Sequence, residues 1–185
     1  MFGIGYIGYM TFIITLLREQ GLGAGTVVAF YVLLGLGVIA SSWLWAGLLQ
    51  RHRSGLPLSL LNGLLALATA LPLVGGSTGA GVAVAFVSAL LFGGVFLSVV
   101  ASTTALVRHN TAQAVWPSGI AAFTIVFAFG QIVGPSVVGW IADGLGGLAQ
   151  GFAFSAAALA LGSVLAAFQR PVQGGAGADP HPDAP

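Results

Sequence analysis

Six long apolar runs, with very little charge between them, limit what this chain of 185 residues can fold into. Hydrophobic residues make up 57% of the chain and charged residues only 5%, whereas an ordinary soluble domain carries about 25% charged residues. So few charges cannot build a surface that faces water, and the sequence therefore predicts an integral membrane protein embedded in a lipid bilayer. The runs cover about residues 2–17, 24–49, 56–74, 80–106, 114–142 and 150–168.

These lengths fit helices that cross a membrane. A helix rises about 1.5 Å per residue and needs roughly 20 residues to span a hydrocarbon core of about 30 Å. Five runs are long enough or nearly so, and we expect the short first helix to be truncated, with the chain beginning inside a longer gene product. The runs are apolar on every face, unlike the alternating strands of membrane barrels. The sequence predicts an all-α domain of six transmembrane helices over residues 1–170 and a disordered, Gly- and Pro-rich tail over 171–185.

The distribution of arginine predicts the orientation. Arg51, Arg53, Arg108 and Arg170 fall on one side of the predicted membrane, and only Arg18 falls on the other. Short loops rich in basic residues stay in the cytoplasm, so both termini are expected to be cytoplasmic. The net charge of +1 gives no reason to expect a nucleic-acid partner.

Catalysis is not expected. No Asp, Glu, Lys, Arg or His lies near the middle of any run, and His52, His109 and His181 all fall in loops or in the tail. A nucleophile and a base therefore cannot be placed together at membrane depth, and this part of the chain offers no proton relay. The sequence predicts no enzyme, no metal site and no cofactor.

The fifth run contains the string GQIVGPSVVGWIAD, which combines close-packing residues with a helix breaker. Gly130, Gly134 and Gly139 would let a neighbouring backbone approach closely, as small residues do in lipid. Pro135 has no N–H, so it frees the carbonyl of Gln131, four residues earlier. We expect a bent helix. It is either a gate with a substrate contact at Gln131 or a packing kink whose polar groups are satisfied by adjacent helices.

Two short patterns indicate an internal repeat. Gly47 and Arg51 have the same spacing as Gly139 and Asp143, and each pair ends the second helix of a three-helix set. The predicted fold is therefore two three-helix repeats of opposite membrane orientation. Many transporters are built in this way, with the substrate near the bilayer midplane between the repeats.

Several strings resemble the major facilitator superfamily. Gly47, Arg51 and Gly55 resemble a degenerate copy of its Gly-x-x-x-Asp-x-x-Gly-Arg loop motif, with Arg51 in the acidic position and the spacing to Gly55 one residue longer. The strings FGIGYIGYMTF, SALLFGGVF and GQIVGPSVVGWIAD are similar to its bacterial YbfB/YjiJ-like branch. The resemblance covers about residues 2–168 and corresponds to helices seven to twelve of that fold.

The resemblance implies a role in transport. It implies a twelve-helix transporter of the bacterial inner membrane that works by alternating access on a small solute, with this chain as the C-terminal half and a six-helix N-terminal half as its partner. Tyr6, Tyr9 and Thr11 on the first helix are candidates to line the central cavity, together with Gln131. Hydroxyl groups tied to a neighbouring helix are the equal alternative for the first three.

Two other functions stay open. The chain could be a non-transporting scaffold or assembly subunit that dimerises through its glycine faces. It could also be a half-transporter that pairs with a second copy of itself. A stable complex of equal stoichiometry would favour the first, and saturable uptake by the purified chain would favour the second.

Overall fold

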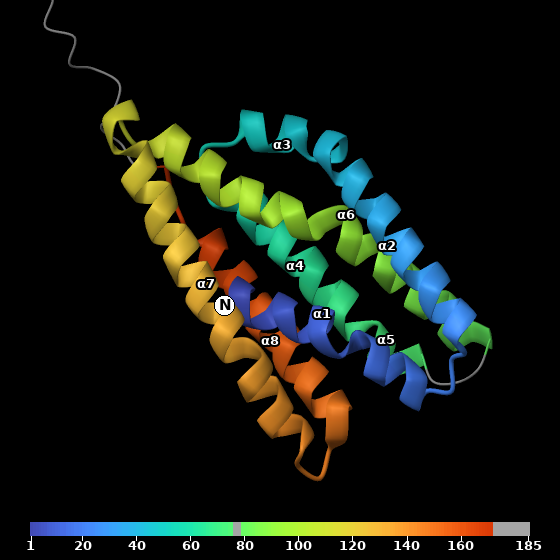
Figure 1. Cartoon of the computed structure of the whole chain (residues 1–185). Coiled ribbons are helices and arrows are strands. Elements are labelled where there is room, and N and C mark those ends of the chain that lie inside the picture. Colours follow the sequence, from blue (N-terminus) through green and yellow to red (C-terminus); the bar gives the residue numbers. More distant parts are fainter. Residues whose placement is uncertain (76–78, 172–185) are drawn as a thin grey trace, which may run out of the picture.

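The computed structural model describes residues 1–75 and 79–171, and every regular element in these two ranges is a helix (Figure 1). Five helical stretches are long and apolar enough to cross a membrane, and α1 is a shorter sixth helix of 18 residues. The prediction of a helical, multi-pass membrane protein is therefore confirmed, whereas nearly all of the predicted tail lies outside the described residues. The elements are α1 Phe2–Glu19, α2 Ala24–Leu44, α3 Ala46–Arg51, α4 Leu56–Ala70, α5 Pro72–Gly75, α6 Gly79–Asn110, the 3₁₀ helix η1 Gln113–Val115, α7 Trp116–Ala142 and α8 Gly147–Ala167.

Two of the apolar runs each contain two helices. Helix α2 ends before Trp45, whose indole Nε1 donates a hydrogen bond to the carbonyl of Gly94 on α6 at 2.6 Å. Leu71 separates α4 from α5, and the Pro72 that follows it has no N–H to continue the hydrogen-bond ladder. The second break is visible in the sequence as a proline. The first is not, because the partner of Trp45 lies in another helix.

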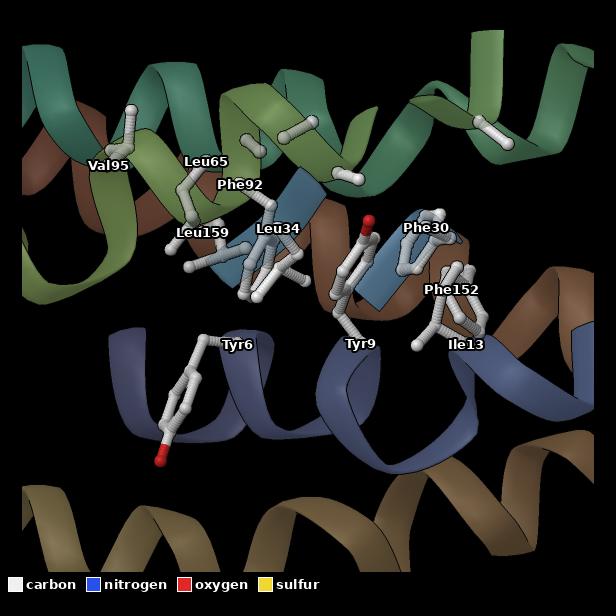
Figure 2. Packing of buried hydrophobic residues seen from close by; sticks show 14 of the residues in the cluster. Tyr6, Tyr9, Ile13, Phe30, Leu34, Leu65, Phe92, Val95, Phe152 and Leu159 are labelled. Carbon is white, nitrogen blue, oxygen red and sulfur yellow. The ribbon is translucent and has the colours of Figure 1, made fainter. Parts of the chain in front are cut away.

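Five pairs of helices make most of the contacts in the bundle. Helix α2 lies along α6, α4 lies between α6 and α8, and α1 is held between α7 and α8 (Figure 1). The centre of the bundle is filled by large side chains from four different helices. Tyr9, Phe30, Phe92 and Phe152 are its fully buried aromatic residues (Figure 2).

Glycine allows α2 and α6 to touch through their backbones. A Cβ atom on Gly93 would overlap the carbonyl oxygen of Leu34, and one on Gly37 would lie 2.9 Å from the backbone nitrogen of Gly94. Lipid tails are as apolar as leucine, so helices in a membrane gain little by hiding apolar surface and instead depend on close packing. This crossing is therefore a principal source of stability for α2.

Candidate functional site

The crossing of α1 and α7 is a second place where two backbones meet. A Cβ on Gly130 would lie 3.1 Å from Cα of Gly3, and one on Gly134 would lie 2.9 Å from the carbonyl oxygen of Ile4. Both Gly130 and Gly134 are buried. These two predicted packing glycines therefore lie where α1 and α7 are in contact.

The other residues predicted for gating or packing lie in more open surroundings. A Cβ on Gly139 would meet only Phe12 Cζ, at 3.7 Å, which is an ordinary van der Waals contact. Gly47 is exposed, and a Cβ there would have nothing within 4 Å. Arg51 is an exposed residue in the last turn of α3.

A polar pair joins α1 to α7 beside the glycine crossing. The side-chain Nε2 of Gln131 donates a hydrogen bond to the hydroxyl of Tyr6. Tyr6 is 7% exposed, and Gln131 is half-buried. Pro135 stands one turn further along α7 and lacks the N–H that would otherwise bond to the carbonyl of Gln131. The pair therefore lies at a point where the backbone of α7 is less constrained.

Three phenylalanine rings hold Tyr6 in place. The ring centroid of Tyr6 lies 4.9 Å from that of Phe2, 5.5 Å from that of Phe127 and 6.0 Å from that of Phe96. The interplanar angles are 21°, 17° and 10°, so the rings are stacked. Stacked rings from α1, α6 and α7 fix the direction of the hydroxyl toward Gln131.

The side chain of Tyr9 points away from α1 in the direction opposite to that of Tyr6 and lies in the core (Figure 2). Its hydroxyl lies 2.7 Å from Ser88 Oγ, and Ser88 donates its own proton to the carbonyl of Ala68 at 2.7 Å. Since a serine hydroxyl has one proton, Tyr9 is the donor to Ser88. This chain of hydrogen bonds ties α1 to α6 and α4.

The four candidate cavity residues thus occupy different surroundings. Tyr6 and Gln131 are brought together, Tyr9 is fully buried in the core, and Thr11 is exposed on α1. Sequence reasoning did not find Ser88, which bonds to Tyr9. Its only signal was a small polar residue at the start of the string SALLFGGVF.

A cavity of about 470 Å³ adjoins the Tyr6–Gln131 pair. Its volume falls within the range of roughly 300–1,000 Å³ that is usual for ligand sites. The walls come from the start of α1 and from α4, α6, α7 and α8, and they are mainly apolar. We call this cavity the apolar groove, and its lining includes Phe2, Leu58, Thr103, Phe123, Phe127 and Leu165.

The fold and this site define a class of protein. The protein is helical and polytopic, a polar pair lies between two helices packed through glycine, and a groove of ligand size lies beside the pair. This architecture is typical of a membrane transporter. The chain belongs to the major facilitator family described as "Uncharacterised MFS-type transporter YbfB", whose model matches residues 1–167. This confirms the resemblance seen in the sequence, and the family is one of transporters, not of enzymes. No curated protein and no solved structure matches the chain.

The Tyr6–Gln131 bond can be tested by a double-mutant cycle. Tyr6→Phe leaves the Gln131 amide without its acceptor, so we expect a loss of about 1 kcal/mol in the free energy of unfolding. Gln131→Leu should cost a similar amount. The double variant should lose less than the sum, with a coupling of about 0.6–1.7 kcal/mol. Reversible unfolding in mixed detergent micelles gives the free energy of unfolding of the unchanged protein, the two single variants and the double variant.

Tyr31→Phe is the matched control for this cycle. Tyr31 is half-buried on α2, away from the crossing of α1 and α7. Combined with Gln131→Leu, it should give additive losses because the two residues are in different helix pairs. Equal coupling in both cycles would refute the bond as a specific link between α1 and α7.

Proposed function

We propose that the chain transports a small solute across the bacterial inner membrane by alternating access, as the C-terminal half of a major facilitator transporter with both termini in the cytoplasm. The family match supports transport in general. The observation that carries the finer proposal is the Tyr6–Gln131 pair beside Pro135. A partly buried polar contact next to a weakened turn of helix is suited to bind a solute and to change shape around it.

The packing of the helices supports two inverted repeats. If α1, α2 and α4 correspond to α6, α7 and α8, the contact of α1 with α7 has its counterpart in that of α6 with α2. The contact of α1 with α8 likewise corresponds to that of α6 with α4, and α4 and α8 pack on each other. Transporters built from such repeats bind the substrate near the midplane between them.

Two exposed apolar stripes support a six-helix partner. Ile125, Phe129 and Ile132 on α7 are 69%, 67% and 74% exposed and follow a spacing of three to four residues, so they share one face. On α2, Val28 and Val32 are exposed at the same kind of spacing. We propose that the N-terminal half faces α2 and α7 and that the cavity for the solute forms between the two halves.

Each candidate residue has a role in this proposal. Tyr6 and Gln131 contact the solute, and Thr11 reaches the cavity from the exposed side of α1. Tyr9 anchors α1 to the helices behind it. Gly130, Gly134, Pro135 and Gly139 let α7 bend. Gly47 and Arg51, both on α3, belong to the segment that opens and closes the cytoplasmic side.

Uptake by proteoliposomes tests the proposal. The chain is reconstituted alone, and in parallel with the product of the reading frame immediately upstream, and both samples are incubated with a metabolite extract from the host cell. Mass spectrometry then identifies solutes that accumulate only with protein. We expect uptake only when the chain is reconstituted together with the upstream product. In that sample Gln131→Leu should reduce the rate of uptake about tenfold, because the variant loses one hydrogen bond. Tyr31→Phe should leave uptake unchanged.

The outcomes separate the competing functions. Saturable uptake by the chain alone would replace the proposal with a self-pairing half-transporter. No uptake from either sample, together with a stable complex of equal stoichiometry, would favour a scaffold or assembly subunit.

A further inference from the structure

The break between α4 and α5 takes the usual hydrogen-bond partner away from one backbone carbonyl. In a continuous helix the carbonyl of Ala68 would accept a bond from the N–H four residues later, but that residue is Pro72, which has none. The carbonyl one residue earlier, on Leu67, does receive its bond, from the N–H of Leu71 at 3.0 Å. Because Ala68 is fully buried, its carbonyl needs a donor from elsewhere in the protein.

Ser88 on α6 is that donor. Its hydroxyl donates a hydrogen bond to the carbonyl of Ala68 at 2.7 Å, and both residues are fully buried. A serine inside a helix often bonds instead to a carbonyl one turn earlier in its own helix. Ser102, a second buried serine on α6, does this with the carbonyl of Val99 at 2.7 Å. Ser88 thus replaces, from a neighbouring helix, the N–H that Pro72 lacks.

Tyr9 on α1 directs the proton of Ser88. The Tyr9 hydroxyl donates to Ser88 Oγ at 2.7 Å, so the proton of Ser88 must point elsewhere, toward Ala68. Two hydrogen bonds in series also strengthen each other. The ring of Tyr9 is stacked on Phe92, one turn after Ser88 on α6, with the ring centroids 3.9 Å apart (Figure 2). This stacking fixes the direction of the Tyr9 hydroxyl.

A second residue at the end of α1 bonds to the same break. The side-chain Nε2 of Gln20, which caps α1, donates to the carbonyl of Pro72 at 2.8 Å. Helix α5 has only four residues, Pro72–Gly75, and a helix this short does not form on its own. The carbonyls of Ala68 and Pro72 are both tied to α1, the first through Ser88 and the second directly. The position of α5 therefore depends on that of α1.

We propose that Ser88 is a positioning residue that holds α5 in place only while Tyr9 donates to it. With α1 in the described position, Ser88 completes the hydrogen bonding of α4 at the proline. When α1 moves and withdraws Tyr9, the Ser88 hydroxyl turns to a carbonyl of its own helix, as that of Ser102 does, and α5 is released. The movement of α1 rests on the proposed function, whereas the hydrogen bonds of the described conformation do not.

A double-mutant cycle between Ser88 and Pro72 tests the replacement of the N–H. Ser88→Ala removes the donor to Ala68 and the acceptor of Tyr9, so the equilibrium constant for unfolding should rise about tenfold. Pro72→Ala restores an N–H four residues after Ala68. In that background Ser88→Ala should raise the constant only about threefold, because the Tyr9 hydroxyl alone loses its partner. Reversible unfolding in mixed detergent micelles gives the four constants.

Ser102→Ala is the matched control for this cycle. It removes a buried serine hydroxyl from the same helix, but one that bonds within that helix. Its effect on the equilibrium constant should be the same with and without Pro72→Ala. If Ser88→Ala also had equal effects in the two backgrounds, Ser88 would not replace the N–H that proline lacks, and the proposal would be wrong.

Tyr9→Phe tests the control by α1. The variant keeps the ring and its stacking on Phe92 but removes the donor to Ser88. Amide hydrogen exchange in residues 73–75, measured by mass spectrometry of the protein in nanodiscs, should become about fivefold faster, as it should in Ser88→Ala. Tyr31→Phe on α2 should leave this exchange unchanged.

Unchanged exchange of α5 in Tyr9→Phe would overturn the proposed link to α1. Neither measurement involves uptake, so both results stand apart from the transport proposal. A cycle and an exchange pattern as expected, in a protein that takes up no solute, would leave the role of Ser88 intact and overturn the proposed function alone.

Discussion

Gly93→Ala is expected to destabilise the protein by about 3 kcal/mol, the upper end of the usual cost of overpacking. The added Cβ would overlap the carbonyl oxygen of Leu34. That oxygen belongs to the backbone of α2, so it cannot rotate away as a side chain would. The two helices would have to separate along their whole contact, and Trp45 would lose its hydrogen bond to the carbonyl of Gly94.

A neighbouring glycine provides the control for this prediction. Gly35 lies on α2, two residues before Gly37, and a Cβ there would have nothing within 4 Å. Gly35→Ala should therefore be neutral or stabilise the helix by up to about 1 kcal/mol. Unfolding of both variants in detergent mixtures gives the comparison. Equal stabilities would mean that α2 and α6 do not cross as described.

Gly134→Ala is expected to abolish the link between α1 and α7. Its Cβ would lie 2.5 Å from Ile7 Cγ2 and 2.9 Å from the carbonyl oxygen of Ile4. Moving α1 away would break the bond between Gln131 and Tyr6. We expect a loss of about 2 kcal/mol in stability, and, in the paired uptake assay, a larger loss of transport than Gln131→Leu causes alone.

Gly139→Ala separates this effect from a general loss of flexibility in α7. Its Cβ would make one ordinary contact, with Phe12 Cζ at 3.7 Å, so stability should stay close to that of the unchanged protein, and any loss of uptake would come from reduced bending of α7 alone. If Gly134→Ala and Gly139→Ala reduced uptake equally, the role of Gly134 would be helix flexibility and not contact with α1.

The sequence predicts the helices well but not their neighbours. A chain with six apolar runs and hardly any charge has few alternatives in a membrane, so helical spans follow from hydropathy alone. The direction in which each helix faces does not. In a soluble helix polar residues mark the outer face, whereas here the buried Leu65 and the exposed Leu67 are the same residue type on one helix.

The candidate site shows the same limit. Gln131 and Pro135 stand out as a polar residue and a helix breaker inside an apolar run, so sequence reasoning could select them. Tyr6 could be selected as a hydroxyl on the first helix. That the two side chains bond to each other could not be predicted, because they are separated by most of the chain and nothing in their local spacing reports on the packing of α1 against α7.

Glycine spacing is similarly ambiguous. Gly130, Gly134 and Gly139 look alike in the sequence, yet the first two touch the backbone of α1 and the third does not. A missing side chain is informative only when the partner surface is known. This is also why Gly47 fits a family motif while a Cβ at that position would meet open space within the described chain.

The position of α1 between α7 and α8 has a consequence for biogenesis. A ribosome adds about 5–20 residues per second, so α7 is made on the order of 10 s after α1 has entered the bilayer. During this interval the glycine face of α1 and the Tyr6 hydroxyl have no partner, whereas Tyr9 can already bond to Ser88 once α6 has been made. A message cut short after α6 would therefore leave α1 attached to α4 and α6 but with its glycine face toward lipid. The last two helices thus complete the burial of α1.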